Sequence, residues 1–179
     1  MNYFDFYHIP VCFRVDEPAL RAIFLKNSRK YHPDFHTLAT EAQQDEMLER
    51  STLNNQAFKT LSDPDRRMRY VLELKGLLGD ESKQPPLSQD FLMDMMDINE
   101  NLMELEFEPD SERYEQTLNA VKSLETNLLS EVQPILDRYS GSDIPLNSGD
   151  PQLIAVRDYF LKRRYLLRIL ENLSKFAPR

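Results

Sequence analysis

Residues 16–34 read DEPALRAIFLKNSRKYHPD and contain the clearest structural pattern of the chain. Asp16 can cap the start of a helix, and Pro18 is tolerated within a first helical turn. At the other end, Pro33 keeps His32 out of the helical backbone region and cannot extend the preceding helix. The pattern predicts a helix that stops at an exposed turn, His32-Pro33-Asp34, which presents an imidazole beside a carboxylate.

Between the cap and the turn, the helix has two faces of different character. Apolar side chains recur at helical spacing on one face: Leu20, Ile23, Phe24 and Tyr31. The other face is basic and carries Arg21, Lys26, Arg29 and Lys30. A charged helix face is most often only a solvent-exposed one. These basic residues are nevertheless candidates for partner binding, because their helix leads directly into the exposed turn.

The neighbouring residues complete a helical hairpin. A second stripe at helical spacing follows the turn and consists of Met47, Ser51, Asn54, Phe58 and Leu61. Asp63-Pro64 then combines a cap with a proline at the first position of another helix. A short aromatic segment at residues 3–7 precedes these elements, and we expect its rings to pack onto the hairpin.

At these residues the chain resembles a J-domain, the module by which co-chaperones stimulate the ATPase of DnaK-type chaperones. The resemblance rests on several short matches: Tyr3-Phe4, Tyr31-His32-Pro33-Asp34, Asn55-Gln56-Ala57-Phe58, Leu61 with Asp63-Pro64, and Arg66, Arg67 and Tyr70. It implies that His32, Pro33 and Asp34 contact the ATPase, with the aspartate paired to a chaperone arginine. It assigns weaker electrostatic contributions to Arg21, Lys26, Arg29 and Lys30.

The composition indicates an all-α protein. Its 179 residues are 41% hydrophobic and include only four glycines, with long stretches of Leu, Met, Glu, Lys and Arg. The single cysteine, Cys12, excludes an internal disulfide and a cysteine-rich zinc module, and it fits a reducing compartment. A net charge of -8 argues against general nucleic-acid affinity. Because no apolar run is long enough to span a membrane and no secretion signal opens the chain, we expect neither secretion nor a membrane partner.

We expect a domain boundary where Gly79 and Pro85-Pro86 interrupt the helical periodicity. The predicted division is a J-domain over 1–76, a linker over 77–86 and a C-terminal domain over 87–179. The C-terminal part shows three helical patterns, at about 88–106, 110–139 and 151–176, which predict a three-helix bundle. Asp150-Pro151 opens the last of these helices, and Pro134 is expected to kink the second.

The first bundle helix carries apolar residues on two faces, although a core needs only one. One face has the spacing of a buried stripe: Phe91, Met95, Ile98, Leu102 and Leu105. The other face groups Leu92, Met93, Met96 and Met103, bordered by Asp97, Glu100 and Glu104. An apolar strip rimmed by acids suits a protein-binding surface, in which methionine adapts to an irregular partner. The alternative is a wider core that the third helix covers.

A J-domain followed by a small helical bundle is similar to the HscB-type co-chaperones of iron-sulfur cluster biogenesis, called Jac-type in mitochondria. The second half of the resemblance rests on residues 91–100, which read FLMDMMDINE. It implies that an IscU-type scaffold protein binds Leu92, Met93, Met96, Asp97, Glu100 and Glu104, with Tyr165 of the last helix as the candidate aromatic partner. Asp97 is shorter than the glutamate common at its position, and Phe35 stands where lysine is frequent. The absence of a cysteine-rich N-terminal extension favours the bacterial cytoplasm over the mitochondrial matrix.

The functional hypothesis is therefore an adaptor without covalent catalysis and without a resident cofactor, which joins a DnaK/HscA-type ATPase to a scaffold protein. Three alternatives stay open. The chain could be a generic J-domain adaptor for another client, or a purely structural helical assembly. It could also be a small metal-binding hydrolase, because His32, Asp34 and His36 place three possible metal ligands within five residues. Against the hydrolase, the sequence has neither a distant ligand cluster nor a glycine-rich phosphate loop.

Overall fold

The computed structural model describes residues 1–79, 85–140 and 149–177. These residues form helices without any β-strand, and their one ladder contact is an isolated bridge between Cys12 and Ser140. The chain divides into two compact units, whose described residues are 1–75 with 136–140 in the first and 76–79, 85–135 and 149–177 in the second. The predicted all-α class is confirmed.

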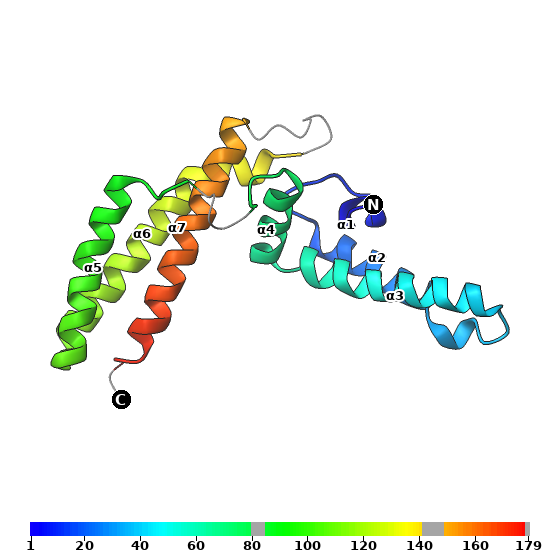
Figure 1. Cartoon of the computed structure of the whole chain (residues 1–179), viewed down its shortest axis with the longest axis horizontal. Coiled ribbons are helices and arrows are strands. Elements are labelled where there is room, and N and C mark those ends of the chain that lie inside the picture. The colour runs from blue at the N-terminus through cyan, green and yellow to red at the C-terminus, as the bar shows by residue number, and fades with distance from the viewer. Residues whose placement is uncertain (80–84, 141–148, 178–179) are drawn as a thin grey trace. The chain divides into compact units, whose positions relative to one another are not determined.

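The first unit contains four α-helices and one short 3-10 helix. In chain order they are α1 (Tyr3–Tyr7), α2 (Glu17–Lys30), the 3-10 helix η1 (Pro33–Phe35), α3 (Glu41–Leu61) and α4 (Pro64–Leu74). The longest pair, α2 and α3, lie side by side and run in opposite directions, with η1 in their connection (Figure 1). This is the helical hairpin that the two apolar stripes predict.

Aspartates begin three of the helices in the way the sequence predicts. The Asp16 carboxylate accepts a hydrogen bond from the Ala19 amide at 2.9 Å, and Asp63 and Asp150 make equivalent bonds at α4 and at α7 (Pro151–Ser174). A proline stands in the first turn of each of these helices, where its missing N–H costs nothing. The caps satisfy amides that the first turn otherwise leaves without a partner.

Aromatic and amide side chains hold the hairpin together. The rings of Phe24 and Phe58 stack at 4.3 Å between centroids. The buried Asn54 side chain donates to the Phe24 carbonyl and to the Ser28 hydroxyl, both at 3.1 Å. The Tyr7 hydroxyl in turn donates to Asn54 Oδ1 at 3.0 Å. The buried polar groups therefore tie α1, α2 and α3 to one another, which fixes the register of the hairpin.

The connections on either side of the hairpin meet at a buried arginine. Arg67 Nε donates to the Phe13 carbonyl at 2.8 Å, and Arg67 Nη1 donates to the Leu61 carbonyl. Burial lowers the pKa of the Arg67 guanidinium. In the same unit, Tyr3 stacks on Tyr70 of α4 at 4.6 Å. The aromatic opening segment thus packs onto the hairpin and α4, as its composition predicts.

The second unit is the predicted three-helix bundle, built from α5 (Gln89–Phe107), α6 (Ser111–Arg138) and α7 (Pro151–Ser174). The helices run alternately down, up and down in Figure 1, so α5 and α7 end on the same side of the bundle. Its core combines Phe91, Met95, Ile98 and Leu105 of α5 with apolar residues of the other two helices, such as Val121, Leu128, Val156, Leu166 and Leu173. Pro134 lies within α6, and the helix continues past it to Arg138.

The connections between the helices include one glycine in a left-handed conformation and two stretches outside the described residues. Gly76 adopts a φ of +70°, a left-handed conformation that favours glycine, directly after α4 and its cap. Of the predicted linker, residues 80–84 lie outside the described part, as do residues 141–148 of the loop before α7.

The last residues of α6 belong with the first unit, in which the Tyr139 ring lies 5.1 Å from that of Phe13. No helix in the described ranges is long and apolar enough to cross a membrane.

Candidate docking sites

The His-Pro-Asp turn is exposed and has a defined backbone. His32 takes the extended conformation that Pro33 imposes (φ −67°, ψ 129°), and η1 begins at the proline itself. His32 Nδ1 accepts a hydrogen bond from the Asp34 amide at 3.2 Å, so the imidazole caps η1. Because Nδ1 acts as an acceptor, this bond belongs to a neutral imidazole with its proton on Nε2. The turn therefore stands as an ordered tip, as the sequence predicts.

Side chains below the turn anchor it to the hairpin. The buried Tyr31 ring lies 6.2 Å from that of Phe6, and the cationic groups of Lys30 and Arg50 lie over it at 5.1 and 5.7 Å. His36 Nε2 forms a hydrogen bond with the Lys30 carbonyl at 2.8 Å, which satisfies a terminal carbonyl of α2. His36 is half-buried. Its ring is part of the support of the turn.

The charges around the turn face solvent. The Asp34 carboxylate is largely exposed, and its nearest cation is His32 Nδ1 at 3.7 Å if that ring is protonated. The basic residues of α2 are also exposed, namely Arg21, Lys26, Arg29 and Lys30. The tip additionally exposes the apolar side chains of Phe35 and Leu38, which the sequence reasoning did not assign to the site. The result is a carboxylate at a tip, with a basic helix face leading to it.

The geometry gives no support to a metal centre at the turn. Within the described residues, no three side chains of His, Cys, Asp or Glu are arranged to hold a metal ion. His36 Nε2 already bonds the Lys30 carbonyl, and His32 Nδ1 accepts from the Asp34 amide. These bonds account for both rings as parts of the turn itself, without a metal ion. The metal-hydrolase alternative therefore loses the observation on which it depended.

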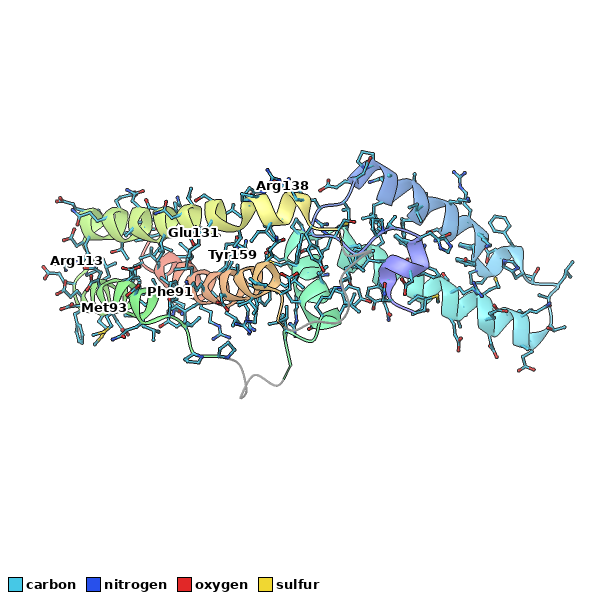
Figure 2. All side chains as sticks on the ribbon, turned by 90° about the horizontal axis from the view of Figure 1, so that it is seen from above. Phe91, Met93, Arg113, Glu131, Arg138 and Tyr159 are labelled. Carbon is cyan, nitrogen blue, oxygen red and sulfur yellow. The ribbon has the colours of Figure 1, made fainter. Side chains whose placement is uncertain are left out.

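The second candidate site is the outer face of α5. Met95 is 2% exposed whereas the adjacent Met96 is 70% exposed, and Leu92, Met93 and Met103 are exposed as well. Figure 2 shows Met93 on the side of α5 that faces away from α6. The alternative interpretation, a wider core covered by α7, is wrong because the second stripe stays in contact with solvent. This stripe is an apolar patch that the bundle does not need for its own core.

Tyr165 borders the α5 face from α7. Its ring packs edge-on against Phe91, with 6.0 Å between centroids and an interplanar angle of 81°. Its hydroxyl accepts a hydrogen bond from Asn99 Nδ2 at 3.3 Å. The structure thus brings Tyr165 next to the helix whose residues the resemblance assigns to scaffold binding.

Acidic side chains rim the apolar patch but differ in their surroundings. Asp97 and Glu100 are exposed. Glu104 forms an ion pair with Arg113 of α6, 3.0 Å between Oε2 and Nη2, near the start of α6 in Figure 2. The pairing compensates part of the Glu104 charge within the bundle. We therefore expect Asp97 and Glu100 to attract a cationic group of a partner more strongly than Glu104 does.

The sequence analysis did not assign Phe107, an exposed residue, to this face. Phe107 is 86% exposed at the last position of α5, four residues after Met103. The signal that would have found it is the same helical spacing that groups Leu92, Met96 and Met103. The predicted helix ended at residue 106, which removed Phe107 from the pattern.

Comparison with known proteins finds a matching family and similar solved structures. Residues 87–174 match the family described as the HSCB C-terminal oligomerisation domain. The fold is similar to that of chaperone HscB from Vibrio cholerae, with 23% identity, a TM-score of 0.65, and coverage of 98% of this chain and 96% of that one. It is also similar to the human co-chaperone protein HscB, with 25% identity, a TM-score of 0.70, and coverage of 98% and 81%.

A helical hairpin with an exposed His-Pro-Asp turn, joined to a three-helix bundle, defines a J-domain co-chaperone. The family match over the bundle and the likeness to HscB structures over nearly the whole chain narrow this class. The chain belongs to the HscB-type co-chaperones.

Proposed function

We propose that this co-chaperone binds an IscU-type iron-sulfur scaffold through the outer face of α5 and stimulates the ATPase of a DnaK/HscA-type chaperone through its His-Pro-Asp turn. Its function is to assist iron-sulfur cluster assembly and transfer. The single observation that supports this proposal best is the exposed apolar face of α5 in a chain that also presents the His-Pro-Asp turn. The proposed division of labour assigns residues 1–76 to the chaperone and residues 87–179 to the scaffold, with 77–86 as the linker.

On the chaperone side, the proposal rests on the exposed charge of the turn. Asp34 can pair with an external arginine without first breaking an ion pair to a lysine or arginine of its own fold, since the basic group beside its carboxylate is the His32 ring, 3.7 Å away. The basic face of α2 adds long-range attraction to an acidic partner. Binding that is stronger to one conformation of the chaperone shifts its equilibrium, so docking alone can stimulate hydrolysis. The chaperone supplies the active site.

On the scaffold side, the proposal rests on the combination of apolar contact and acidic rim. Leu92, Met93 and Met96 offer apolar surface, and the flexible methionines adapt to the shape of a partner. Asp97 and Glu100 favour a partner that presents lysine or arginine beside its apolar contact residues. Glu104 and Tyr165 complete the proposed surface. We place this function in the bacterial cytoplasm, with the mitochondrial matrix as the alternative, because the similar structures come from a bacterium and from human.

A bridging assay tests the proposal. Immobilised IscU-type scaffold should capture a purified HscA-type chaperone, with ATP present, more strongly when this co-chaperone is added. The double variant Leu92→Ala, Met93→Ala should not bind the scaffold, whereas His32→Gln should bind the scaffold but fail to stimulate ATP hydrolysis. Leu129→Ala is the matched control, because Leu129 is exposed on α6 of the same unit and lies outside both surfaces.

Three results would overturn the proposal in different ways. Stimulation of the ATPase without any scaffold binding would show a J-domain adaptor for another client. Scaffold binding without stimulation would remove the assigned role of the turn. Loss of helicity in the double variant would mean that the α5 face is part of the core, and circular dichroism distinguishes this result from a loss of docking.

A further inference from the structure

The exposed apolar stripe of α5 extends beyond the residues proposed above. Met103 is 61% exposed, and Phe107 is more exposed still. At helical spacing, Leu92, Met96, Met103 and Phe107 fall on one side of the helix, so the stripe follows α5 from its first turn to its last. An exposed phenylalanine at a helix end contributes almost nothing to the core of its own bundle. The distal half of α5 therefore presents apolar surface that its fold does not use.

A groove lies beside this distal half. It has a volume of about 500 Å³ and is lined by residues of α5, by one residue of the last turn of α7 and by two residues that follow α7: Asn99, Leu102, Met103, Glu106, Asn172, Lys175 and Phe176. Met103 belongs both to the stripe and to the groove. A volume of this size is within the range of cavities that enclose a small ligand, and it is open to an inserted side chain. The apolar stripe thus leads into a hollow with a polar border.

The charges along α5 indicate what kind of partner fits. The helix contains six acidic residues, Asp90, Asp94, Asp97, Glu100, Glu104 and Glu106, and no lysine or arginine. Arg113 compensates Glu104, and the cation at the groove, Lys175, already donates to Asn172 Oδ1 at 3.0 Å. A segment with lysine or arginine beside an apolar anchor complements this surface. A second copy that met α5 with its own α5 would place acid against acid.

We propose that the distal half of α5 is a second contact area for the same scaffold partner and binds a basic-flanked apolar segment of it. Phe107 and Met103 contact the apolar side chains of the segment, one of which enters the groove, and Glu106 faces its basic flank. This inference rests on the proposed function, because it lengthens the footprint of the same partner. Its consequence is that apolar recognition continues past Met96 along the distal half of α5 and reaches the last residue of the helix, Phe107.

Calorimetric titration of the full-length chain with purified IscU-type scaffold tests the inference. The double variant Met103→Ala, Phe107→Ala should bind about 5- to 10-fold more weakly than the wild type, a loss typical of truncated interface anchors. Met96→Ala reports on the proximal half and should weaken binding by a similar factor. Leu129→Ala, at a side chain that is 37% exposed on α6, is the matched control and should bind as the wild type does. Glu106→Gln should reduce the salt dependence of binding.

The outcomes separate this inference from the function on which it rests. If Met96→Ala weakens binding while the distal double variant binds normally, the inference is wrong and the proposed function stands. If the wild type does not bind the scaffold, both are wrong. An unchanged salt dependence in Glu106→Gln removes the basic flank from the proposal.

A photo-crosslinking residue in place of Phe107 gives a second readout that does not depend on affinity. The inference predicts a crosslink to the scaffold. A crosslink to a second copy of the chain, accompanied by a dimer in sedimentation that the Phe107→Ala variant lacks, would show that this face serves self-association and would overturn the inference. Because Phe107 is exposed, we expect these substitutions to leave the melting temperature unchanged.

Discussion

The two proposed docking surfaces use opposite means to stay exposed. The His-Pro-Asp turn is a short segment held by its own hydrogen bonds, in which His32 caps η1 and His36 bonds the end of α2. The outer face of α5 is held from behind, because the opposite side of the same helix is buried in the bundle. At the turn, charge is presented by backbone geometry. On α5, apolar surface is presented by the periodicity of a helix.

This difference teaches where function and stability can be separated. A charge at the turn can be removed without touching the core, because the carboxylate of Asp34 makes no buried contact. On α5, residues that stabilise the core lie next to residues that are exposed for docking. Met95 and Met96 are the clearest such pair. The same side chain is a core residue at one position and a docking residue at the other. Substitutions at these two regions therefore test the comparison directly.

The largest effect is expected at the turn. Asp34→Asn should abolish stimulation of the chaperone ATPase, because it removes the charge that pairs with an arginine of the partner. Its free energy of unfolding should stay within about 0.5 kcal/mol of the wild-type value. Single-turnover ATPase rates and a urea titration measure the two quantities. Asp45→Asn, at an exposed position of α3, is the matched control and should stimulate normally.

The adjacent methionines of α5 should give the next largest effects, Met95 on the stability of the fold and Met96 on scaffold binding. Met95→Ala should lower the free energy of unfolding by about 2–4 kcal/mol, because it opens a cavity in the core. Met96→Ala should leave that free energy nearly unchanged and weaken scaffold binding about 10-fold. Chemical denaturation and calorimetric titration measure the pair. Equal destabilisation by both substitutions would show that the two faces of α5 do not differ.

A smaller effect is expected from the hydrogen bond that ties α1 to α3. Burial raises the pKa of the Tyr7 hydroxyl above its ordinary value of about 10, so the folded chain keeps this proton where the unfolded chain loses it. The free energy of unfolding should therefore fall as the pH rises above about 10, toward the raised pKa. Tyr7→Phe should cost about 1–2 kcal/mol at neutral pH, since Asn54 Oδ1 loses its donor, and should make the alkaline decline shallower.

The decline should not vanish in Tyr7→Phe, because burial also raises the pKa of Tyr70. ATPase stimulation at neutral pH should be unaffected, since the turn does not involve Tyr7. An alkaline decline as steep in the variant as in the wild type would contradict the burial of this hydroxyl.

The smallest effect is expected at the rim of the α5 face. Glu104→Gln should weaken scaffold binding by no more than about 2-fold, because Arg113 already compensates this charge. Glu100→Gln should have the larger effect, because Glu100 is exposed and forms no such ion pair with another described residue. Affinities measured at two salt concentrations compare the two variants. A larger loss for Glu104→Gln would mean that the scaffold displaces Arg113.

Much of this structure could be predicted because local chemistry determines it. Asp16, Asp63 and Asp150 mark helix starts through side-chain caps, and each acts within three residues of its own position. The His-Pro-Asp turn follows from the conformational limits of one proline. The two faces of α5 follow from helical periodicity, although the pattern alone left open whether the second face was buried. Exposure was decided by α6 and α7, whose packing is a tertiary property.

What the sequence did not reveal depends on contacts between distant residues or on exact helix ends. The hydrogen bond between His36 and Lys30 joins residues across the turn and has no sequence signature. The buried Arg67 bonds the carbonyls of Phe13 and Leu61, one of which is 54 residues away. The groove beside Met103 requires the end of α7 to lie against α5. Phe107 was missed because helix ends are the least certain part of a periodic pattern.

The central claim is that both docking surfaces act together on one chain, and complementation in trans tests it most directly. Scaffold-dependent stimulation of the chaperone ATPase would be measured with Asp34→Asn and with the double variant Leu92→Ala, Met93→Ala, separately and as an equimolar mixture, in which each chain retains one intact surface. The mixture should stimulate no more than the sum of the two variants, because neither chain joins the chaperone to the scaffold. Recovery of the wild-type rate by the mixture would contradict it.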